Sequence, residues 1–493
     1  MESVWTQSCE IGKREPLPGN QRTEAAVIGA GMTGLLTAYL LREAGLQVVV
    51  LEAGRMAGGQ TGGTTAKLTS QHGLLYHQLI LDLGEEDAAL YAEANEKAIE
   101  ACRDIIQKRN IACDFTDTFS CVYSDHREKL EAEVQAAARL GLPASFVKDI
   151  PFPAPAAGAV RFENQAQFHP LRFLKALSEG LTVYEETPVR AVEGHRIQTD
   201  RGEVKAQYII FACHFPFVNF PGLYFARMHQ ERSYVLALRD APPMEGMWLG
   251  ADQPTYSLRR WGDILLFGGS DHRTGENTGG GRYDALRQKA REWFPGARET
   301  AHWSAQDCVT PDRIPYIGRY TSGKPYWYVA TGFGKWGMST SMAAAMLLRD
   351  AICGRKNPCA RVFSPDRFPA RGVPRIMTET GQAVKGLTRQ VLQTPSITAE
   401  ELPAGQGSVV LLNGKKAGVY KAEDGKIHAV DIRCPHLGCQ LEWNPDEKSW
   451  DCPCHGSRFD CLGRLISGPA QTDLDSSLRT GRRSLPPSVE RSP

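Results

Sequence analysis

A glycine-rich turn between an apolar run and a helical pattern is the feature that most restricts the fold of this chain. Residues 29–34 read G-A-G-M-T-G; they follow the apolar run 25–28, open a helical pattern over 32–44 and precede a second apolar run at 47–51. This order predicts a strand–helix–strand unit in a parallel sheet covered on both faces, because both strands are apolar throughout. The three glycines permit a tight turn, close approach to a pyrophosphate, and close packing of helix on strand.

An acidic residue and a loop of small residues extend this pattern. Glu52 ends the second strand, where a carboxylate accepts hydrogen bonds from a ribose hydroxyl. The helix N-terminus offers unpaired N–H groups to phosphates. The loop 53–67 is dense in glycine and threonine, so it can lie flat against a large ligand. These features predict a dinucleotide site; the alternative for the glycine pattern alone is a turn that only packs a helix.

The turn and this loop together resemble the FAD-dependent oxidoreductases of the D-amino-acid oxidase (DadA-like) superfamily, over roughly residues 22–352. The segment 208–213 looks like that family's strand returning to the cofactor, and 310–318 with 330–338 looks like its closing FAD motif. The resemblance implies a Rossmann-like FAD-binding domain with an inserted α+β substrate domain. The residues it places at FAD are Gly29, Gly31, Met32, Thr33, Gly34, Glu52, Ala53, Gly59, Thr61, Thr64, Thr65, Ala66, Val189, Ala212, Gly334, Lys335, Trp336, Gly337 and Met338.

The catalytic candidates follow from the chemistry of a flavin that oxidises an amine or amino acid. Hydride leaves the donor for flavin N5, and the protein positions the donor and excludes water. A donor carboxylate favours an arginine fork backed by a tyrosine, so Arg232, Tyr234 and His272 are candidates. Lys335 could be the cation beside the reduced flavin. Ordinary surface or core roles are the alternative for all four. No second such glycine turn follows a strand, which favours an organic donor over NAD(P)H.

Two short Cys/His motifs near the C-terminus predict a second site. Residues 434–439 read C-P-H-L-G-C, and residues 452–457 read C-P-C-H-G-S. A Rieske centre binds one iron through two thiolates and the other through two imidazoles. The pattern supplies these ligands from two loops. They are Cys434, His436, Cys452 and His455. A tetrahedral zinc ribbon uses the same ligand types and is the alternative.

The residues around these ligands resemble the Rieske family. The resemblance implies a small all-β domain with a [2Fe–2S] cluster and a disulfide between Cys439 and Cys454, although a reducing compartment opposes that disulfide. The segment 468–470 resembles the family's proline loop over the cluster.

The expected organisation is an α/β oxidoreductase followed by an all-β domain. We expect an N-terminal extension over 1–21, an oxidoreductase over 22–353, a linker with a short helix over 354–395, a Rieske domain over 396–474 and a disordered tail over 475–493. Within the oxidoreductase the FAD-binding parts are about 22–80, 180–220 and 305–353, with the substrate part between them.

Composition and motifs together limit the function. The net charge is +1 and no apolar run reaches about 18 residues, so we expect no nucleic acid and no integral membrane segment. The first residues lack an apolar signal region, which predicts a cytoplasmic protein. We expect FAD to oxidise a small-molecule donor and the cluster to pass single electrons to a ferredoxin, cytochrome or quinone. The alternatives are a reductase or oxygenase component that receives electrons through the cluster, and a redox sensor without turnover.

One departure from the Rieske pattern predicts the reduction potential of the cluster. Respiratory-type Rieske proteins carry a tyrosine two residues after the serine, whereas Phe459 follows Ser457 here. Since hydrogen bonds to the cluster sulfurs raise the potential, the loss of one donor lowers it, within a Rieske range of about −150 to +300 mV. A Phe459→Tyr variant should therefore show a higher midpoint in an EPR-monitored redox titration. An unchanged midpoint would remove the argument.

Overall fold

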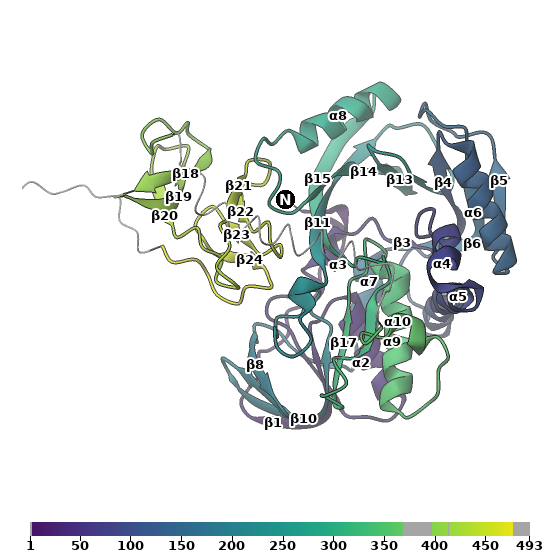
Figure 1. Ribbon diagram of the computed structural model, residues 1–493, viewed down its shortest axis with the longest axis horizontal. Helices are drawn as coiled ribbons and strands as arrows, with labels where there is room; N and C mark the ends of the chain where they lie inside the picture. Colours follow the sequence, from purple (N-terminus) through teal and green to yellow (C-terminus); the bar gives the residue numbers. More distant parts are fainter. Residues whose placement is uncertain (1, 368–396, 413, 477–493) are drawn as a thin grey trace, which may run out of the picture. The chain divides into compact units, whose positions relative to one another are not determined.

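The computed structural model describes residues 2–367, 397–412 and 414–476 (Figure 1). They belong to two compact units. The first is Met1–Arg273 with Gly281–Thr380, and the second is Thr274–Gly280 with Gly381–Pro493. The predicted linker helix and all but the first two residues of the predicted tail lie outside the described residues. The first part of the predicted linker instead belongs to the core of the first unit, where α10 (Ala360–Phe363) buries Phe363 completely.

An eight-stranded, mainly parallel sheet forms the nucleotide-binding half of the first unit. Its main order is β16-β17-β10-β1-β2-β7, with β9 on β10 and β8 on β9. The strands are β1 (Gln21–Ile28), β2 (Val48–Leu51), β7 (Thr182–Tyr184), β8 (Val189–Glu193), β9 (Arg196–Thr199), β10 (Gly202–Phe211), β16 (Tyr316–Arg319) and β17 (Trp327–Thr331). Glu186, with a positive φ of 49°, turns the chain between β7 and β8. The strands β8, β9 and β10 form an antiparallel meander.

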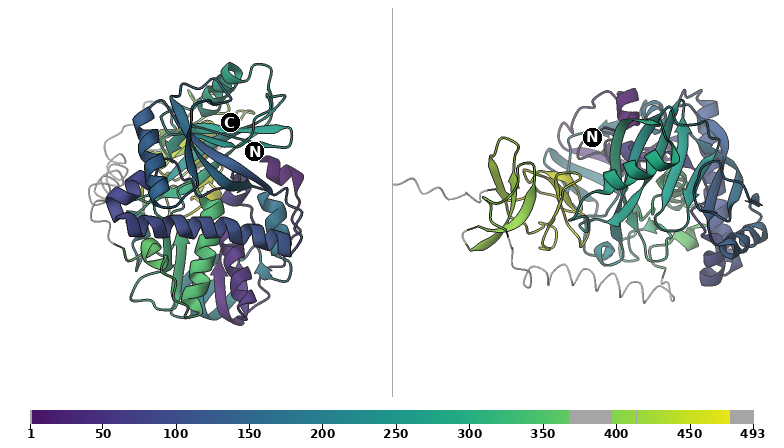
Figure 2. Two further views of the ribbon diagram at one scale, coloured as in Figure 1. Left: turned by 90° about the vertical axis from the view of Figure 1, so that its right-hand side faces the viewer. Right: turned by 90° about the horizontal axis from the view of Figure 1, so that it is seen from above.

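Both faces of this sheet are buried, as its apolar strands require. Val27 belongs to a core shared with the helices, whereas its neighbours Ala26 and Ile28 face a second core. The helices of the first core include α2 (Met32–Glu43), α5 (Glu85–Lys108) and α9 (Gly337–Ile352). Figure 2 shows α5 along its length in the left view. This alternation of faces along β1 is the two-residue period of a strand covered on both sides.

A nine-stranded, mostly antiparallel sheet forms the other half of the first unit. Its order is β15-β11-β14-β13-β12-β4-β6-β3, with β5 on β6. The strands are β3 (Lys67–Leu68), β4 (Thr116–Ser124), β5 (Ala144–Val147), β6 (Gly158–Gln167), β11 (His229–Arg239), β12 (Met247–Gly250), β13 (Tyr256–Trp261), β14 (Ile264–Arg273) and β15 (Arg298–Val309). The remaining helices of the unit are α1 (Val4–Ser8), α3 (Gln60–Gly63), α4 (Tyr76–Leu83), α6 (Arg127–Arg139), α7 (Pro170–Leu177), α8 (Arg282–Trp293) and the 3₁₀ turn Tyr224–Ala226.

The second unit contains two small antiparallel sheets. One is β18 (Gly407–Leu412), β19 (Lys415–Lys421) and β20 (Ile427–Val430); the other is β21 (Glu442–Asn444), β22 (Ser449–Asp451), β23 (Arg458–Asp460) and β24 (Leu465–Ser467). Trp450 and Phe459 fill the core beside four buried cysteines. The same unit includes Thr274–Gly280, whose Asn277 amide donates hydrogen bonds to Asn444 (3.0 Å) and Asp446 (2.8 Å). No helix in the described part of the chain is long and apolar enough to cross a membrane.

The contact of α2 with the preceding turn gives a test of the fold. A β-carbon on Gly34 would lie 1.8 Å from the carbonyl oxygen of Gly29, so the backbone itself would have to move. We expect Gly34→Ala to lower the free energy of unfolding by about 3 kcal/mol, the upper part of the range for overpacking. The exposed Gly323 has open space around it, so Gly323→Ala should change the same quantity by less than about 0.5 kcal/mol. Urea titrations followed by circular dichroism measure both; equal effects would contradict the packing argument.

Candidate cofactor and cluster sites

The predicted glycine turn has the tight geometry that a dinucleotide site requires. Gly29 has a φ of +105°, and a β-carbon there would lie 2.6 Å from the carbonyl oxygen of Ala212. Gly31 faces Thr61, whose hydroxyl would lie 3.3 Å from a β-carbon and accepts a hydrogen bond from the Met32 N–H at 3.0 Å. The Met32–Thr61 hydrogen bond therefore holds the start of α2 against the following loop. The glycines leave the backbone of the turn uncovered by side chains.

Glu52 lies at the end of β2, as predicted, and its carboxylate organises the backbone around it. It accepts hydrogen bonds from the Ala30 N–H at 2.7 Å and the Gly54 N–H at 2.9 Å. Burial raises the pKa of Glu52, and the backbone N–H donors oppose this shift. The remaining lone pairs of the two oxygens can accept hydrogen bonds from a ribose.

The predicted closing segment lies between β17 and α9 and has a strained backbone. Gly334 and Lys335 both have positive φ, 54° and 75°, and for a lysine this conformation is uncommon. The Trp336 ring stacks on the His72 ring, with centroids 4.9 Å apart and planes 21° apart. Such strain at a non-glycine residue is typical of functional sites.

His72, which no sequence motif singled out, fixes this segment to the rest of the site. Its Nδ1 lies 2.6 Å from the Tyr91 hydroxyl, and its Nε2 lies 2.9 Å from the Thr69 carbonyl oxygen and 3.1 Å from the Ser339 hydroxyl. Burial lowers the pKa of His72 to about 3, so the imidazole is neutral at physiological pH. Its position shortly after the glycine/threonine loop was the only signal in the sequence.

Lys335 does not offer a free positive charge. Its Nζ lies 2.9 Å from Asp271 and 3.1 Å from Glu231. Burial disfavours the charged form, but the two carboxylates outweigh it and raise the pKa of Lys335. Burial also raises the pKa of nearby Asp307 to about 6. The structure therefore places Lys335 among carboxylates that neutralise it.

The other three catalytic candidates lie together on neighbouring strands. Arg232 on β11 pairs in register with His272 on β14, and the Tyr234 hydroxyl lies 2.9 Å from His272 Nε2. The Arg232 guanidinium donates to Gln306 Oε1 at 3.2 Å and contacts the Ser304 hydroxyl. Arg232 and Tyr234 are buried. These residues form one polar cluster between β11, β14 and β15.

Two further cations beside the glycine/threonine loop were not singled out from the sequence. Lys67 is half-buried, and its Nζ donates to the Trp248 carbonyl oxygen at 2.7 Å and the Ser257 hydroxyl at 2.6 Å. Arg259 is 1% exposed; it donates to the carbonyl oxygen of Ala66, and its Nε has no hydrogen-bond partner. Within the described ranges neither residue forms an ion pair. A buried charge without a partner is costly, so this arrangement suits an anion.

Burial lowers the pKa of both of these cations. It lowers the pKa of Lys67 to about 7, with a further contribution from the charge of Arg259, and it lowers the pKa of Arg259 to about 9. A bound anion would favour the protonated form of each group.

The four predicted cluster ligands converge from two loops of the second unit. The Nδ1 atoms of His436 and His455 lie 3.2 Å apart, with ring centroids at 4.8 Å and planes at 90°. The Cys434 and Cys452 thiols contact each other by a hydrogen bond. Cys434, Cys452 and His455 are buried and His436 is half-buried. Burial lowers the pKa of His436 to about 4, which keeps it neutral. Two facing thiols and two facing imidazole nitrogens are the donor set of a Rieske centre.

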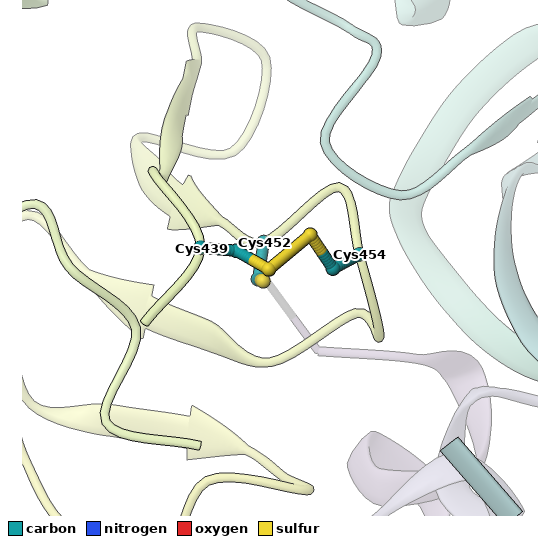
Figure 3. Close-up of side chains that lie close together, drawn as sticks. All are labelled: Cys439, Cys452 and Cys454. Carbon is teal, nitrogen blue, oxygen red and sulfur yellow. A yellow bond between two sulfur atoms is a disulfide. The ribbon is translucent and has the colours of Figure 1, made fainter. Parts of the chain in front are cut away.

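A disulfide lies beside these ligands (Figure 3). It joins Cys439 to Cys454, the pairing that the resemblance implied. The sulfur of Cys452 lies within 4.8 Å of both disulfide sulfurs. Because the disulfide sulfurs are bonded to each other, this group of three is not a metal site; the disulfide ties the two ligand loops together.

The predicted proline loop lies next to the ligand loops. The Ser457 hydroxyl accepts a hydrogen bond from the Ala470 N–H at 2.9 Å and also contacts the Cys434 thiol. Phe459 is fully buried in the same apolar core as Cys434 and Cys452. The serine thus orients both the loop over the site and one of its sulfurs.

Comparison with known proteins agrees with both predicted domain families. The family model described as FAD dependent oxidoreductase matches residues 24–351, and that of the Rieske [2Fe-2S] domain matches 393–478. A putative Rieske 2Fe-2S iron-sulfur protein, YhfW of Bacillus subtilis (strain 168), is 38% identical over 498 residues, which is 96% of this chain and 98% of that protein. The cytochrome b6-f complex iron-sulfur subunit of Synechococcus elongatus is 31% identical over 24% of this chain and 64% of its own.

Solved structures share the fold of the first unit. Glycine oxidase from Geobacillus kaustophilus gives a TM-score of 0.60 at 18% identity and covers 71% of this chain and 99% of its own. L-proline dehydrogenase from P. horikoshii gives a TM-score of 0.61 at 16% identity and covers 71% of this chain and 98% of its own. At these identities the likeness establishes the fold alone.

The disulfide between the ligand loops gives a prediction for cluster stability. It closes a loop of 15 residues. For a loop of this length the chain-entropy relation gives a stabilisation of about 3 kcal/mol. Replacing both Cys439 and Cys454 by alanine should leave the cluster able to form but make it bleach faster on heating. Following the visible absorbance of the cluster at rising temperature measures this. A free cysteine outside this unit, Cys102→Ala, is the control; equal bleaching in wild type and double variant would contradict the role of the disulfide.

Proposed function

Because the chain belongs to the FAD dependent oxidoreductase family and ends in a Rieske [2Fe–2S] domain, we propose that it oxidises a small amine or amino acid and delivers the electrons to a one-electron acceptor. Bound FAD supplies the acceptor for a hydride, and the cluster carries single electrons. The carboxylate-free cation pair Lys67 and Arg259, beside the loop that follows Glu52, is the observation that supports an anionic donor.

The proposed cluster ligands are Cys434 and Cys452 on one iron and His436 and His455 on the other. Their support is the mutual approach of the two thiols and of the two Nδ1 atoms. The proposed FAD contacts are the glycine turn 29–34, Glu52, the loop 59–66 and the closing segment 334–338. Geometry supports Gly29 and Glu52 most directly, since a side chain is excluded at the first and a carboxylate is held in place at the second.

The chain's own residues have distinct tasks in this proposal. Lys67 binds the donor carboxylate, and Arg259 adds positive potential while it fixes the Ala66 carbonyl. The stacked rings of His72 and Trp336 give a rigid wall that excludes water. Asp307, whose pKa burial raises to about 6, can take up a proton near neutral pH.

The acceptor in this proposal is a ferredoxin, a cytochrome or a quinone, since each takes one electron at a time. The alternatives are a reductase or oxygenase component and a redox sensor without turnover. They differ in what an organic donor does: in the proposed direction a donor alone reduces both centres, whereas in the alternatives it reduces neither.

The test is anaerobic addition of amino acids, and of the same amines without the carboxylate, to the full-length holoprotein. Donor should bleach the flavin absorbance and then produce the EPR signal of the reduced cluster. Lys67→Met should raise the apparent dissociation constant for carboxylate donors by about 10- to 100-fold, the value of one charge-assisted hydrogen bond. The change should be much smaller for amines without a carboxylate. Lys97, exposed and paired with Glu93, provides the control variant Lys97→Met.

The affinity for carboxylate donors in the same experiment should depend on pH. Lys67 is protonated below its pKa of about 7 and neutral above it, so carboxylate affinity should fall as pH rises through that region. Lys67→Arg should keep its charge and remove this dependence. Flavin that no amine or amino acid bleaches would contradict the proposed function. Bleaching that is indifferent to Lys67→Met would reject only the role of Lys67.

A further inference from the structure

The N-terminal extension lies on the loop that follows Glu52. Helix α1 (Val4–Ser8) begins after Ser3, whose hydroxyl donates to the Gly62 carbonyl oxygen. The indole Nε1 of Trp5 donates to the Thr64 carbonyl oxygen at 2.6 Å. Two residues of the extension thus bind two carbonyl groups of the predicted FAD loop.

Other side chains of the first unit hold the neighbouring carbonyl groups in the same way. The Trp303 indole donates to the Gly63 carbonyl oxygen at 2.8 Å, and Arg259 donates to that of Ala66. In a trans peptide the C=O of one residue points opposite to the N–H of the next. The amides of residues 63 and 64 donate within helix α3. Because Trp5 holds the Thr64 carbonyl group, the amide of Thr65 is turned away from that donor.

Trp5 is rigidly held. It is fully buried, and its ring lies 5.0 Å from the rings of both His169 and Trp261 and 5.2 Å from the Arg259 guanidinium. The Ser8 hydroxyl lies 3.0 Å from His169 Nε2. The donor to Thr64 therefore cannot move without disturbing its surroundings.

A second part of the extension binds the start of the same loop. The Ile11 carbonyl oxygen accepts a hydrogen bond from Arg55 at 3.0 Å, and the Arg14 N–H donates to Glu185 at 3.0 Å. Glu185 also accepts from the Met56 N–H at 2.7 Å and pairs with Arg55 at 2.8 Å. The extension thus holds the loop at both ends, just after Glu52 and just before β3.

We propose that Ser3 and Trp5 are positioning residues for FAD. Ser3 holds the C-terminal end of α3 through the Gly62 carbonyl group. Trp5 holds the Thr64 carbonyl group outward and so keeps the Thr65 amide directed at the polar groups of the cofactor. Any buried indole or hydroxyl needs a hydrogen-bond partner, and Ser3 and Trp5 both have theirs in the same predicted FAD loop. The extension is then part of the cofactor site, and its loss weakens FAD binding more than it weakens the fold.

The test compares three variants of the full-length chain. Trp5→Phe keeps an aromatic ring but loses the donor to Thr64, and Ser3→Ala loses the donor to Gly62. Trp327→Phe is the matched control, because Trp327 is equally buried in the first unit and its Nε1 donates to the Gly194 carbonyl oxygen at 2.7 Å. The apoprotein of each is titrated with FAD, with quenching of flavin fluorescence as the readout, and its melting temperature is measured without FAD.

We expect Trp5→Phe to raise the FAD dissociation constant about tenfold, the equivalent of one hydrogen bond of about 1.4 kcal/mol. Ser3→Ala should raise it about threefold to tenfold, and Trp327→Phe by less than about twofold. The apoprotein melting temperature should fall by similar amounts in Trp5→Phe and Trp327→Phe. Equal FAD affinity in Trp5→Phe and Trp327→Phe would overturn the proposal. Should Trp5→Phe not fold, an unchanged affinity in Ser3→Ala would overturn it alone.

Discussion

Helix α2 can lie directly on the parallel sheet only because Gly34 has no side chain. A β-carbon there would overlap the Gly29 carbonyl group, and a β-carbon on Gly29 would meet the end of β10. These two contacts bring the N-terminus of the helix to the carboxyl end of the central strands. The position of Glu52, the course of the loop that follows it and the approach of α9 through the Thr33–Ser341 hydrogen bond of 2.8 Å all depend on this arrangement.

The charges around the site are balanced in two different ways. Lys335 is surrounded by carboxylates and stays protonated. Among the described residues, Lys67 and Arg259 have carbonyl, hydroxyl and aromatic partners and no carboxylate in an ion pair. Burying an unpaired cation costs free energy unless a ligand supplies the opposite charge. The charge of Lys335 is compensated without a ligand, whereas the charges of Lys67 and Arg259 would be stabilised by a bound anion. This difference, and not the number of basic residues, separates a structural lysine from a ligand-binding one here.

The second unit is small, so its hydrophobic core alone contributes limited stability. Its two ligand loops are held by a disulfide, by the Ser457–Ala470 hydrogen bond and by the packing of Trp450 and Phe459. Held in this way, the two thiols and the two imidazoles face each other. Because these contacts join residues that are close in the sequence, a short stretch of sequence is enough to predict the ligands.

The sequence by itself determined the features that depend on neighbouring residues: the βαβ unit with its glycine turn, Glu52 at the strand end, and the spacing of the Cys/His motifs. It also indicated two kinds of domain, because each motif is contiguous. Tertiary structure alone decided what depends on distant segments meeting: His72 against Trp336, Lys67 beside Arg259, Phe363 of the predicted linker in the core, and Trp5 on the Thr64 carbonyl. Lys335 shows the limit best: its motif indicated a cation in the closing segment, but two carboxylates from β11 and β14 set its charge balance. Local spacing fixes backbone conformation and ligand order, whereas burial and charge depend on side chains that only the folded chain brings together.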